Sequence, residues 1–356
     1  MKSRAQLAAA GGILLIMTGC AAAPPETEPD GPGSTDIQPC IVSTVGGFND
    51  QSFNEFNLDG IQQASDQLGV EALSVESSDA EDYATNIDNM IAQGCTLIET
   101  LSFDMIQATR DAAIANPDID FLMLDATLQD ENGDPLELDN VKPIVFDTRE
   151  ASFLAGYAAA ATTVSGKVGV WGGLQIPPVV DFMDGFARGV AYFNDENGKS
   201  VDVIGWDTAT QDGLFVGGFT DQVGAKTLSA NLLDQGVEVI MPVAGVLFQG
   251  TLAAMADRPG TDVAIIGVNS DGYDVVPDSA SLYLTSVLKN MANATRDAVL
   301  QVAADGFDNK VYVGTLENDG VGIAPFHDFE SKVPSDLSSK LDALRQQIVD
   351  GSVDVG

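Results

Sequence analysis

The chain has 356 residues, of which 45% are hydrophobic, and its 16 basic and 53 acidic residues give a formal net charge of −37. This charge argues against nucleic acid and anionic membrane surfaces as partners, because both would be repelled, and it favours a neutral or cationic ligand. The sequence has a single histidine, which argues against a histidine-based metal site or catalytic triad. The length exceeds one ordinary domain and predicts two.

The N-terminal segment has the layout of a secretory signal. Two basic residues precede the apolar stretch 7–17, which is shorter than the roughly 20 apolar residues that span a bilayer. Gly19 and Cys20 resemble a bacterial lipobox, in which Cys20 would be acylated. We therefore expect residues 1–19 to be a signal peptide and Cys20 to anchor the protein to the extracytoplasmic face of the cell membrane. An ordinary signal peptide with an incidental cysteine is the alternative.

Residues 20–39 are rich in Pro, Glu, Gly and Thr without apolar periodicity, which predicts a disordered tether. Beyond it, Cys40 and Cys95 begin the first and third predicted strands. These strands are neighbours in a doubly wound sheet ordered 2-1-3, so in an exported protein we expect a disulfide between the two cysteines. Two free buried cysteines are the alternative.

Apolar strand-like runs alternate with helical patterns from residue 40 onward, which predicts βαβ units and parallel sheets. The strands expected in a first lobe are 40–45, 70–75, 96–101, 121–125 and 141–146. The strands expected in a second lobe are 167–171, 201–206, 237–243 and 263–268. Pro242 weakens the prediction of a regular strand at the end of 237–243, because proline has no backbone N–H to donate to the hydrogen bonds between strands.

The C-terminal part is expected to cross between the lobes several times. After a strand at 282–288, a helix at about 292–304 would return to the first lobe, and a strand at 311–316 and a helix at 335–349 would go back to the second. Such crossings predict a hinged pair of lobes that encloses a ligand by closure. We assign residues 40–148 with about 270–308 to lobe 1, and about 149–269 with about 309–356 to lobe 2.

The segment after the first strand is the first candidate for ligand contact, because ligands of α/β proteins bind at the carboxyl ends of strands. Ser52 and Glu55 have the spacing of a capping box at a helix start. Asn49 and Asp50 are therefore expected on a loop that faces the ligand, where two polar side chains suit a hydroxyl-bearing ligand better than a phosphate. Leu58 lies off the apolar stripe of the following helix and is a candidate for contact with the ligand or the opposite lobe.

Three aspartates fall at or just beyond the carboxyl ends of predicted strands: Asp50, Asp125 and Asp271. If they face one cleft, they would either perform acid and base chemistry or accept hydrogen bonds from ligand hydroxyls. Capping a helix or a turn is the alternative for each of them. We expect no metal and no cofactor, since the acidic loop 129–140 lacks the glycine spacing of an EF-hand and no P-loop or GxGxxG follows a strand.

Several motifs follow one another along the chain: 49–54 with Gly60, 153–157, 171–173, 176–180, 216–221, 243–245, 267–271 and 285–290. In this order they resemble the basic membrane protein family, the PnrA-like nucleoside-binding lipoproteins of ABC importers. The resemblance covers nearly everything from Cys40 onward. It implies an α/β protein with a type I periplasmic-binding fold, in which two Rossmann-like lobes with parallel sheets are joined by a multi-strand hinge.

The resemblance also implies a ligand-binding set spread over both lobes: Asn49, Asp50, Leu58, Asp125, Phe219, Gly245, Asp271 and Lys289. Phe219 would stack on the base, and Gly245 would allow close backbone approach. Asp271 with Lys289 would grip the ribose hydroxyls, and Asp271 would compensate the lysine charge. The family often has an aromatic residue where this chain has Leu58, so the base would lie between Phe219 and an aliphatic side chain.

Together these observations predict a monomeric, lipid-anchored solute receptor that is not an enzyme. It would capture nucleosides, with purine nucleosides favoured, and deliver them to a permease with a separate ATPase. A pentose receptor of the same fold, an enzyme acting on nucleosides, and a sensor without a transport partner are the alternatives.

Overall fold

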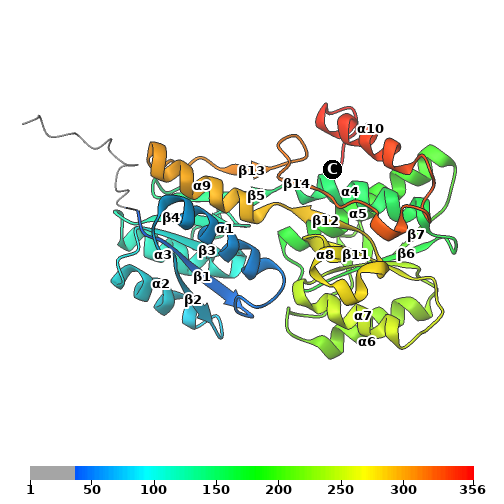
Figure 1. Cartoon of the computed structure of the whole chain (residues 1–356), viewed down its shortest axis with the longest axis horizontal. Helices are drawn as coiled ribbons and strands as arrows, with labels where there is room; N and C mark the ends of the chain where they lie inside the picture. Colours follow the sequence, from blue (N-terminus) through cyan, green and yellow to red (C-terminus); the bar gives the residue numbers. More distant parts are fainter. Residues whose placement is uncertain (1–36) are drawn as a thin grey trace, which may run out of the picture. The chain divides into compact units, whose positions relative to one another are not determined.

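The computed structural model describes residues 37–356. The expected signal peptide, the acylated Cys20 and most of the tether lie outside the described residues. In the part of the chain that is described, no helix has the length and apolarity needed to cross a membrane. The chain forms an α/β structure with two parallel-dominated sheets, one in each of two lobes (Figure 1).

The first lobe is built on a six-stranded sheet in the order β13-β5-β4-β3-β1-β2, in which every neighbouring pair is parallel. Its strands are β1 (Pro39–Val45), β2 (Leu73–Ser77), β3 (Leu97–Leu101), β4 (Asp120–Leu124), β5 (Val141–Phe146) and β13 (Tyr312–Gly314). Its helices are α1 (Phe53–Leu68), α2 (Asp82–Ala92), α3 (Ile106–Ala115) and α9 (Met291–Asp305), with the 3-10 turn η1 (Phe103–Met105). β3 is buried along its whole length, as is typical of a parallel strand covered on both faces.

The second lobe repeats this plan with the order β14-β12-β11-β10-β6-β7, in which only β12 and β14 are antiparallel. Its strands are β6 (Lys167–Gly172), β7 (Asp202–Ile204), β10 (Val239–Val243), β11 (Ala264–Asn269), β12 (Tyr283–Lys289) and β14 (Val321–Ile323), with a separate pair β8 (Trp206–Asp207) and β9 (Asp212–Gly213). Its helices are α4 (Thr148–Thr162), α5 (Pro177–Asn197), α6 (Gln222–Asp234), α7 (Phe248–Ala256), α8 (Gly272–Val275) and α10 (Leu337–Val349). Short 3-10 turns are η2 (Gly245–Leu247), η3 (Pro277–Leu282) and η4 (His327–Phe329).

Pro242 lies inside β10 and affects one of its two ladders. The pairing of β10 with β6 continues to Val243, whereas its pairing with β11 extends only over Val239 and Ile240. This one-sided loss is expected for a residue without a backbone N–H.

The strands at the C-terminal crossings differ from the sequence-based assignment. β12 belongs to the second sheet, beside β11, although residues 270–308 were expected in lobe 1. β13 pairs with β5 in the first sheet, although residues 309–356 were expected in lobe 2 (Figure 1). The apolar pattern of a segment predicts that it forms a strand. Which sheet the strand joins depends on which sheet has an unpaired edge strand, and this depends on how the whole lobe folds. α9 packs on α1 and so returns the chain to the first lobe.

The structure has a disulfide between Cys40 and Cys95, whose Cα atoms are 6.0 Å apart. Both residues are buried. They lie at the amino ends of β1 and β3, and these two strands are neighbours in the sheet. The disulfide thus lies at the amino ends of the strands, and the carboxyl ends lie at the opposite end of the sheet.

Candidate functional site

A cleft of about 530 Å³ lies at the carboxyl ends of strands from both sheets. The first lobe contributes the loop between β1 and α1, the turn η1 and the end of β4, while the second contributes the segment after β6, the loop before α6, η2 and the ends of β11 and β12. The cleft is lined by six of the residues expected to bind ligand: Asn49, Asp50, Asp125, Phe219, Gly245 and Lys289. Leu58 and Asp271 do not line it.

Asp50 caps helix α1. Its carboxylate accepts hydrogen bonds from the backbone N–H groups of Ser52 at 3.0 Å, Asn54 at 3.0 Å and Glu55 at 3.2 Å. The expected capping box is wrong, because Ser52 makes no side-chain cap bond and Glu55 accepts from the N–H of Gln51. An aspartate brings two acceptor oxygens and a negative charge to the positive end of the helix dipole, which a serine hydroxyl cannot match.

Ser52, freed from capping, contacts the other lobe. Its hydroxyl accepts a hydrogen bond from the side-chain amide of Asn269, at the end of β11, at 3.3 Å. Gly245 lies close by, since a Cβ added there would be 3.8 Å from the Ser52 Oγ. Gly245 has a φ of +52°, in the left-handed region that favours glycine. The two lobes therefore touch at one wall of the cleft.

An ion pair joins the lobes inside the cleft. Lys289, the last residue of β12, places its ammonium 2.6 Å from the carboxylate of Asp125, which follows β4. Their side chains are 2% and 11% exposed. The ammonium also lies 5.4 Å from the ring centroids of Phe146 and Phe182, within the range of cation–π attraction. This pair supplies both a hydrogen-bond donor and an acceptor to anything bound beside it.

Asp271 does not compensate the charge of Lys289, so that expectation is wrong. Its carboxylate accepts from the backbone N–H of Tyr273 at 3.1 Å, as the cap of α8, and lies 2.7 Å from the Nε2 of His327. The imidazole of His327 stacks on the Tyr273 ring, with 4.0 Å between centroids. The chain turns into α8 directly after β11, which carries Asp271 away from the cleft and leaves Asn269 in its wall.

Leu58 is half-buried, packs on the hydrophobic core and does not line the cleft, so its contact with a ligand or the opposite lobe stays a prediction. The face of α1 that looked polar is partly covered by α9: Asn57 is fully buried and its side chain accepts from the Thr295 hydroxyl at 3.4 Å. The aromatic residue of α1 that lines the cleft is Phe53, which the sequence analysis did not single out. Its position in the first turn of the helix, directly after the Asp50 cap, is the signal that could have identified it.

Phe219 lies in the opposite wall, and the backbone of Gly173 fixes its place. The N–H groups of Gly217 and Gly218 donate to the Gly173 carbonyl at 2.9 and 3.1 Å. A Cβ at Gly173 would be 2.4 Å from the Phe219 ring, so only glycine lets the ring lie there. An aromatic ring from each lobe thus lines the same cleft.

Further residues of the cleft wall were not singled out from the sequence: Ser102, Phe103, Asp104, Phe182 and Asn269. Asp104 accepts a hydrogen bond from the Tyr83 hydroxyl at 2.6 Å, and burial raises the pKa of its carboxyl. Within residues 37–356, no three His, Cys, Asp or Glu side chains come together in a way that could hold a metal ion. The cleft has the groups to hold a flat ring and to pair with polar substituents on it.

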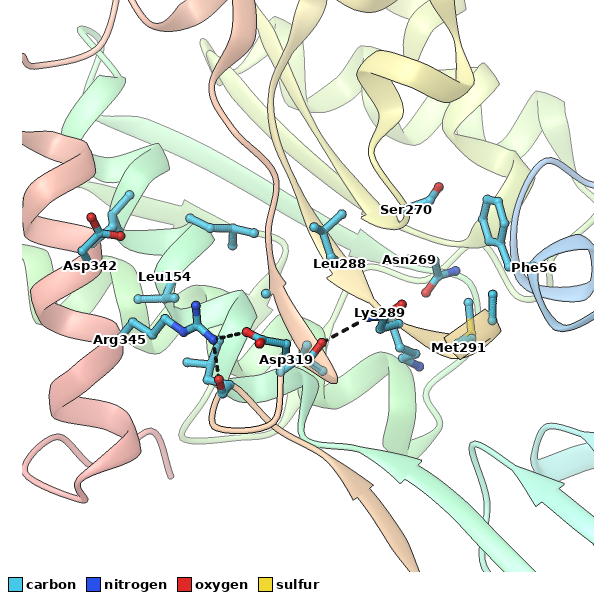
Figure 2. A pocket seen from close by; sticks show the side chains of 17 residues that line it. Phe56, Leu154, Asn269, Ser270, Leu288, Lys289, Met291, Asp319, Asp342 and Arg345 are labelled. Carbon is cyan, nitrogen blue, oxygen red and sulfur yellow. Dashed lines mark hydrogen bonds and ion pairs between the residues drawn. The ribbon is translucent and has the colours of Figure 1, made fainter. Parts of the chain in front are cut away.

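A second cavity, of about 480 Å³, is bordered by β12, β14 and α10 and shares Asn269 and Lys289 with the cleft (Figure 2). In Figure 2 the guanidinium of Arg345 points toward Asp319, with which it pairs. Arg345 also donates to the Leu316 carbonyl. Of the predicted ligand-binding residues this cavity contains only Lys289. The cleft is therefore the better candidate for the principal site.

Comparison with known proteins places the chain among transport receptors. The family model described as ABC transporter substrate-binding protein PnrA-like matches residues 37–356. Basic membrane protein A1 of Borrelia garinii subsp. bavariensis is 25% identical over 329 residues, covering 91% of this chain and 90% of that protein. The ABC transporter nucleoside-binding protein BmpA of Lactococcus lactis subsp. cremoris is 27% identical over 341 residues, covering 90% and 89%.

The solved structures agree on the fold. The ABC transporter solute-binding protein from Aeropyrum pernix superposes with a TM-score of 0.78 at 23% identity, covering 89% of this chain and 92% of that one. A second solute-binding protein, from Conexibacter woesei, has a TM-score of 0.65 at 21% identity, covering 89% and 98%. The two lobes with parallel-dominated sheets are those of the type I periplasmic-binding fold.

Proposed function

We propose, since the chain belongs to the PnrA-like family of ABC transporter substrate-binding proteins, that its ligands are nucleosides and, among these, purine nucleosides. In this proposal the protein closes on the ligand, performs no chemistry on it, and delivers it to a permease driven by a separate ATPase. Cys20 carries the lipid that holds the protein at the extracytoplasmic face of the membrane. The nucleoside-binding name of the Lactococcus relative supports the choice of ligand.

The observation that carries the proposal is the pairing of two aromatic rings with one ion pair in a single cleft. Phe53 and Phe219 line it from opposite lobes, and Lys289 and Asp125, which form an ion pair, line the same cleft. A base stacked on an aromatic side chain gains about 1–3 kcal/mol. Ribose hydroxyls can both donate to a carboxylate and accept from an ammonium, and such charge-assisted hydrogen bonds are the stronger kind.

Calorimetric titration of the purified protein with inosine, guanosine, adenosine, uridine and ribose tests the proposal. We expect purine nucleosides to bind more tightly than uridine, because the larger ring system covers more of the aromatic walls, and ribose to bind most weakly. Ribose binding as tight as inosine would support a pentose receptor instead. Release of free base during prolonged incubation would indicate an enzyme.

Phe219→Leu tests the stacking directly, because leucine keeps an apolar side chain and removes the ring face. We expect nucleoside binding to weaken by about 1–3 kcal/mol, measured by the same titration. Phe307→Leu is the matched control, since Phe307 is half-buried outside the cleft. Equal affinities in the two variants would remove Phe219 from the site.

A further inference from the structure

Three carboxylates of the first lobe line the cleft, and they differ in how much of their acceptor capacity is used. Asp50 receives three backbone N–H groups and the Asn54 amide. Asp125 is paired with Lys289. Asp104 accepts from the Tyr83 hydroxyl on Oδ2 at 2.6 Å, and its own backbone N–H and the Ser102 side chain are two further donors to this carboxylate. A carboxylate has about four lone-pair sites, so Asp104 retains acceptor capacity for a ligand.

The position of Asp104 in the sheet order places it on the base side of a bound nucleoside. The order β4-β3-β1 puts the carboxyl end of β3 between those of β4 and β1. Asp125 follows β4, Asp104 follows β3, and Phe53 begins the helix after β1. Neighbouring strands are about 4.8 Å apart, so these three ends span roughly the length of a nucleoside. A ribose held at the buried Lys289–Asp125 pair would direct the base along this order, toward Asp104 and Phe53.

A carboxylate at this position distinguishes purine bases by the hydrogen at N1. Guanine and hypoxanthine carry a 6-oxo group and an N1–H donor, and guanine adds a 2-amino donor, whereas adenine has an unprotonated N1 that would face the carboxylate as a second acceptor. We propose that Asp104 accepts the N1–H of the base and makes the protein prefer 6-oxopurine nucleosides, inosine and guanosine, over adenosine. This inference rests on the proposed function and deepens it.

Two neighbouring side chains fit this role. Tyr83 is 2% exposed and its hydroxyl accepts the N–H of Val45 at 3.3 Å, so it holds Asp104 in place as a positioning residue. Asn49 is exposed in the same wall, and among the described residues none hydrogen-bonds its side chain. Its amide N–H can donate to the 6-oxo oxygen.

The test compares Asp104→Asn with the unchanged protein by calorimetry, using inosine, guanosine, adenosine and 1-methylinosine. We expect the unchanged protein to bind inosine about tenfold or more tightly than adenosine, the size of discrimination that one well-placed pair of hydrogen bonds gives. 1-Methylinosine, which lacks the N1–H, should bind as weakly as adenosine. In Asp104→Asn the inosine-to-adenosine preference should fall to about onefold or reverse, because an asparagine amide can donate to N1 of adenine and accept from its 6-amino group.

Asp118→Asn is the matched control, because it removes the same charge at an exposed aspartate before the amino end of β4. It should leave all affinities unchanged. Equal binding of inosine and adenosine by the unchanged protein, or a preference that Asp104→Asn does not alter, would overturn the inference while nucleoside binding itself stands. Absence of binding by every nucleoside would instead overturn the proposed function. Circular dichroism of each variant checks that it is folded.

Discussion

At the residue scale, three aspartates that follow strands show how the position of a side chain in the fold decides its role. Asp50, Asp125 and Asp271 all follow strands, and each has a different partner: the amides of a helix start, the ammonium of Lys289, and the imidazole of His327. The sequence predicted that all three face one cleft, but only Asp50 and Asp125 line it. The sequence could not distinguish a capping carboxylate from a free one, because both occur at strand ends.

The Lys289–Asp125 pair supports a mutational prediction. Asp125→Asn removes the carboxylate from an ammonium that is 2% exposed, and an uncompensated buried charge costs about 3–5 kcal/mol. We expect the free energy of unfolding, measured by urea denaturation, to fall by roughly that amount.

The double variant Asp125→Asn/Lys289→Met is the control for this prediction. It removes the uncompensated charge of Lys289 and keeps an apolar side chain near Phe146 and Phe182. It should recover a large part of the lost stability. A double variant no more stable than Asp125→Asn alone would show that the buried charge is not the cause.

At the element scale, helix packing decides which faces the sequence patterns present. α1 looked amphipathic with one polar side, but α9 returns from the second lobe and buries Asn57 on that side. The two helices approach closely at Gly60, where an added Cβ would be 2.6 Å from the Ala292 carbonyl. Close approach also joins α4 to α5 in the second lobe. These contacts position the segments that line the cleft.

The contact between α4 and α5 predicts a strong effect of one methyl group. A Cβ at Gly156 would be 2.0 Å from the Phe186 carbonyl oxygen, so Gly156→Ala must push the helices apart. We expect a loss of about 1–3 kcal/mol in unfolding free energy, as for other overpacked cores, measured by chemical denaturation. Gly322→Ala, where an added Cβ meets nothing within 4 Å, is the matched control. Comparable losses in both variants would contradict the packing explanation.

Glu99 on β3 gives a prediction for pH dependence. It is fully buried, it accepts from the Thr295 hydroxyl of α9 at 2.5 Å, and burial raises its pKa to about 8 from 4.5. Below pH 4.5 the carboxyl is protonated in both folded and unfolded chains and has no effect on stability. Between pH 4.5 and about 8 only the unfolded chain loses the proton, so stability falls as pH rises.

Glu99→Gln should remove this part of the pH dependence. We expect its unfolding free energy relative to that of the unchanged protein to rise from pH 5 to pH 8, measured by denaturation at each pH. A difference that stays constant over this range would mean that Glu99 is already ionised in the folded protein.

At the scale of the whole molecule, stability and binding are divided between opposite ends of the sheets. The Cys40–Cys95 disulfide joins the amino ends of β1 and β3, whereas the cleft lies at the carboxyl ends. The disulfide closes a loop with a sequence separation of 55 residues, and removing a bridge of this kind costs about 2–5 kcal/mol. Cys40→Ala/Cys95→Ala should therefore lower the unfolding free energy by that amount.

Nucleoside affinity should stay unchanged in the same double variant, provided that the temperature is below its melting transition. Denaturation measures the first effect and calorimetric titration the second. A stable variant with weakened binding would show that the disulfide acts on the cleft through the sheet.

The sequence by itself determined the alternation of strands and helices, the strand ends that carry Asn49, Asp50 and Asp125, and the family. These follow from local patterns: apolar periods, glycines at helix ends, and short motifs in a fixed order. Only the tertiary structure decided which carboxylate pairs with Lys289, which face of α1 is buried, and which sheet receives β12 and β13. Each of these depends on groups far apart in the chain. Lys289 and Asp125, for example, are separated by 164 residues, and no local sequence pattern indicates which residue will pair with a buried charge.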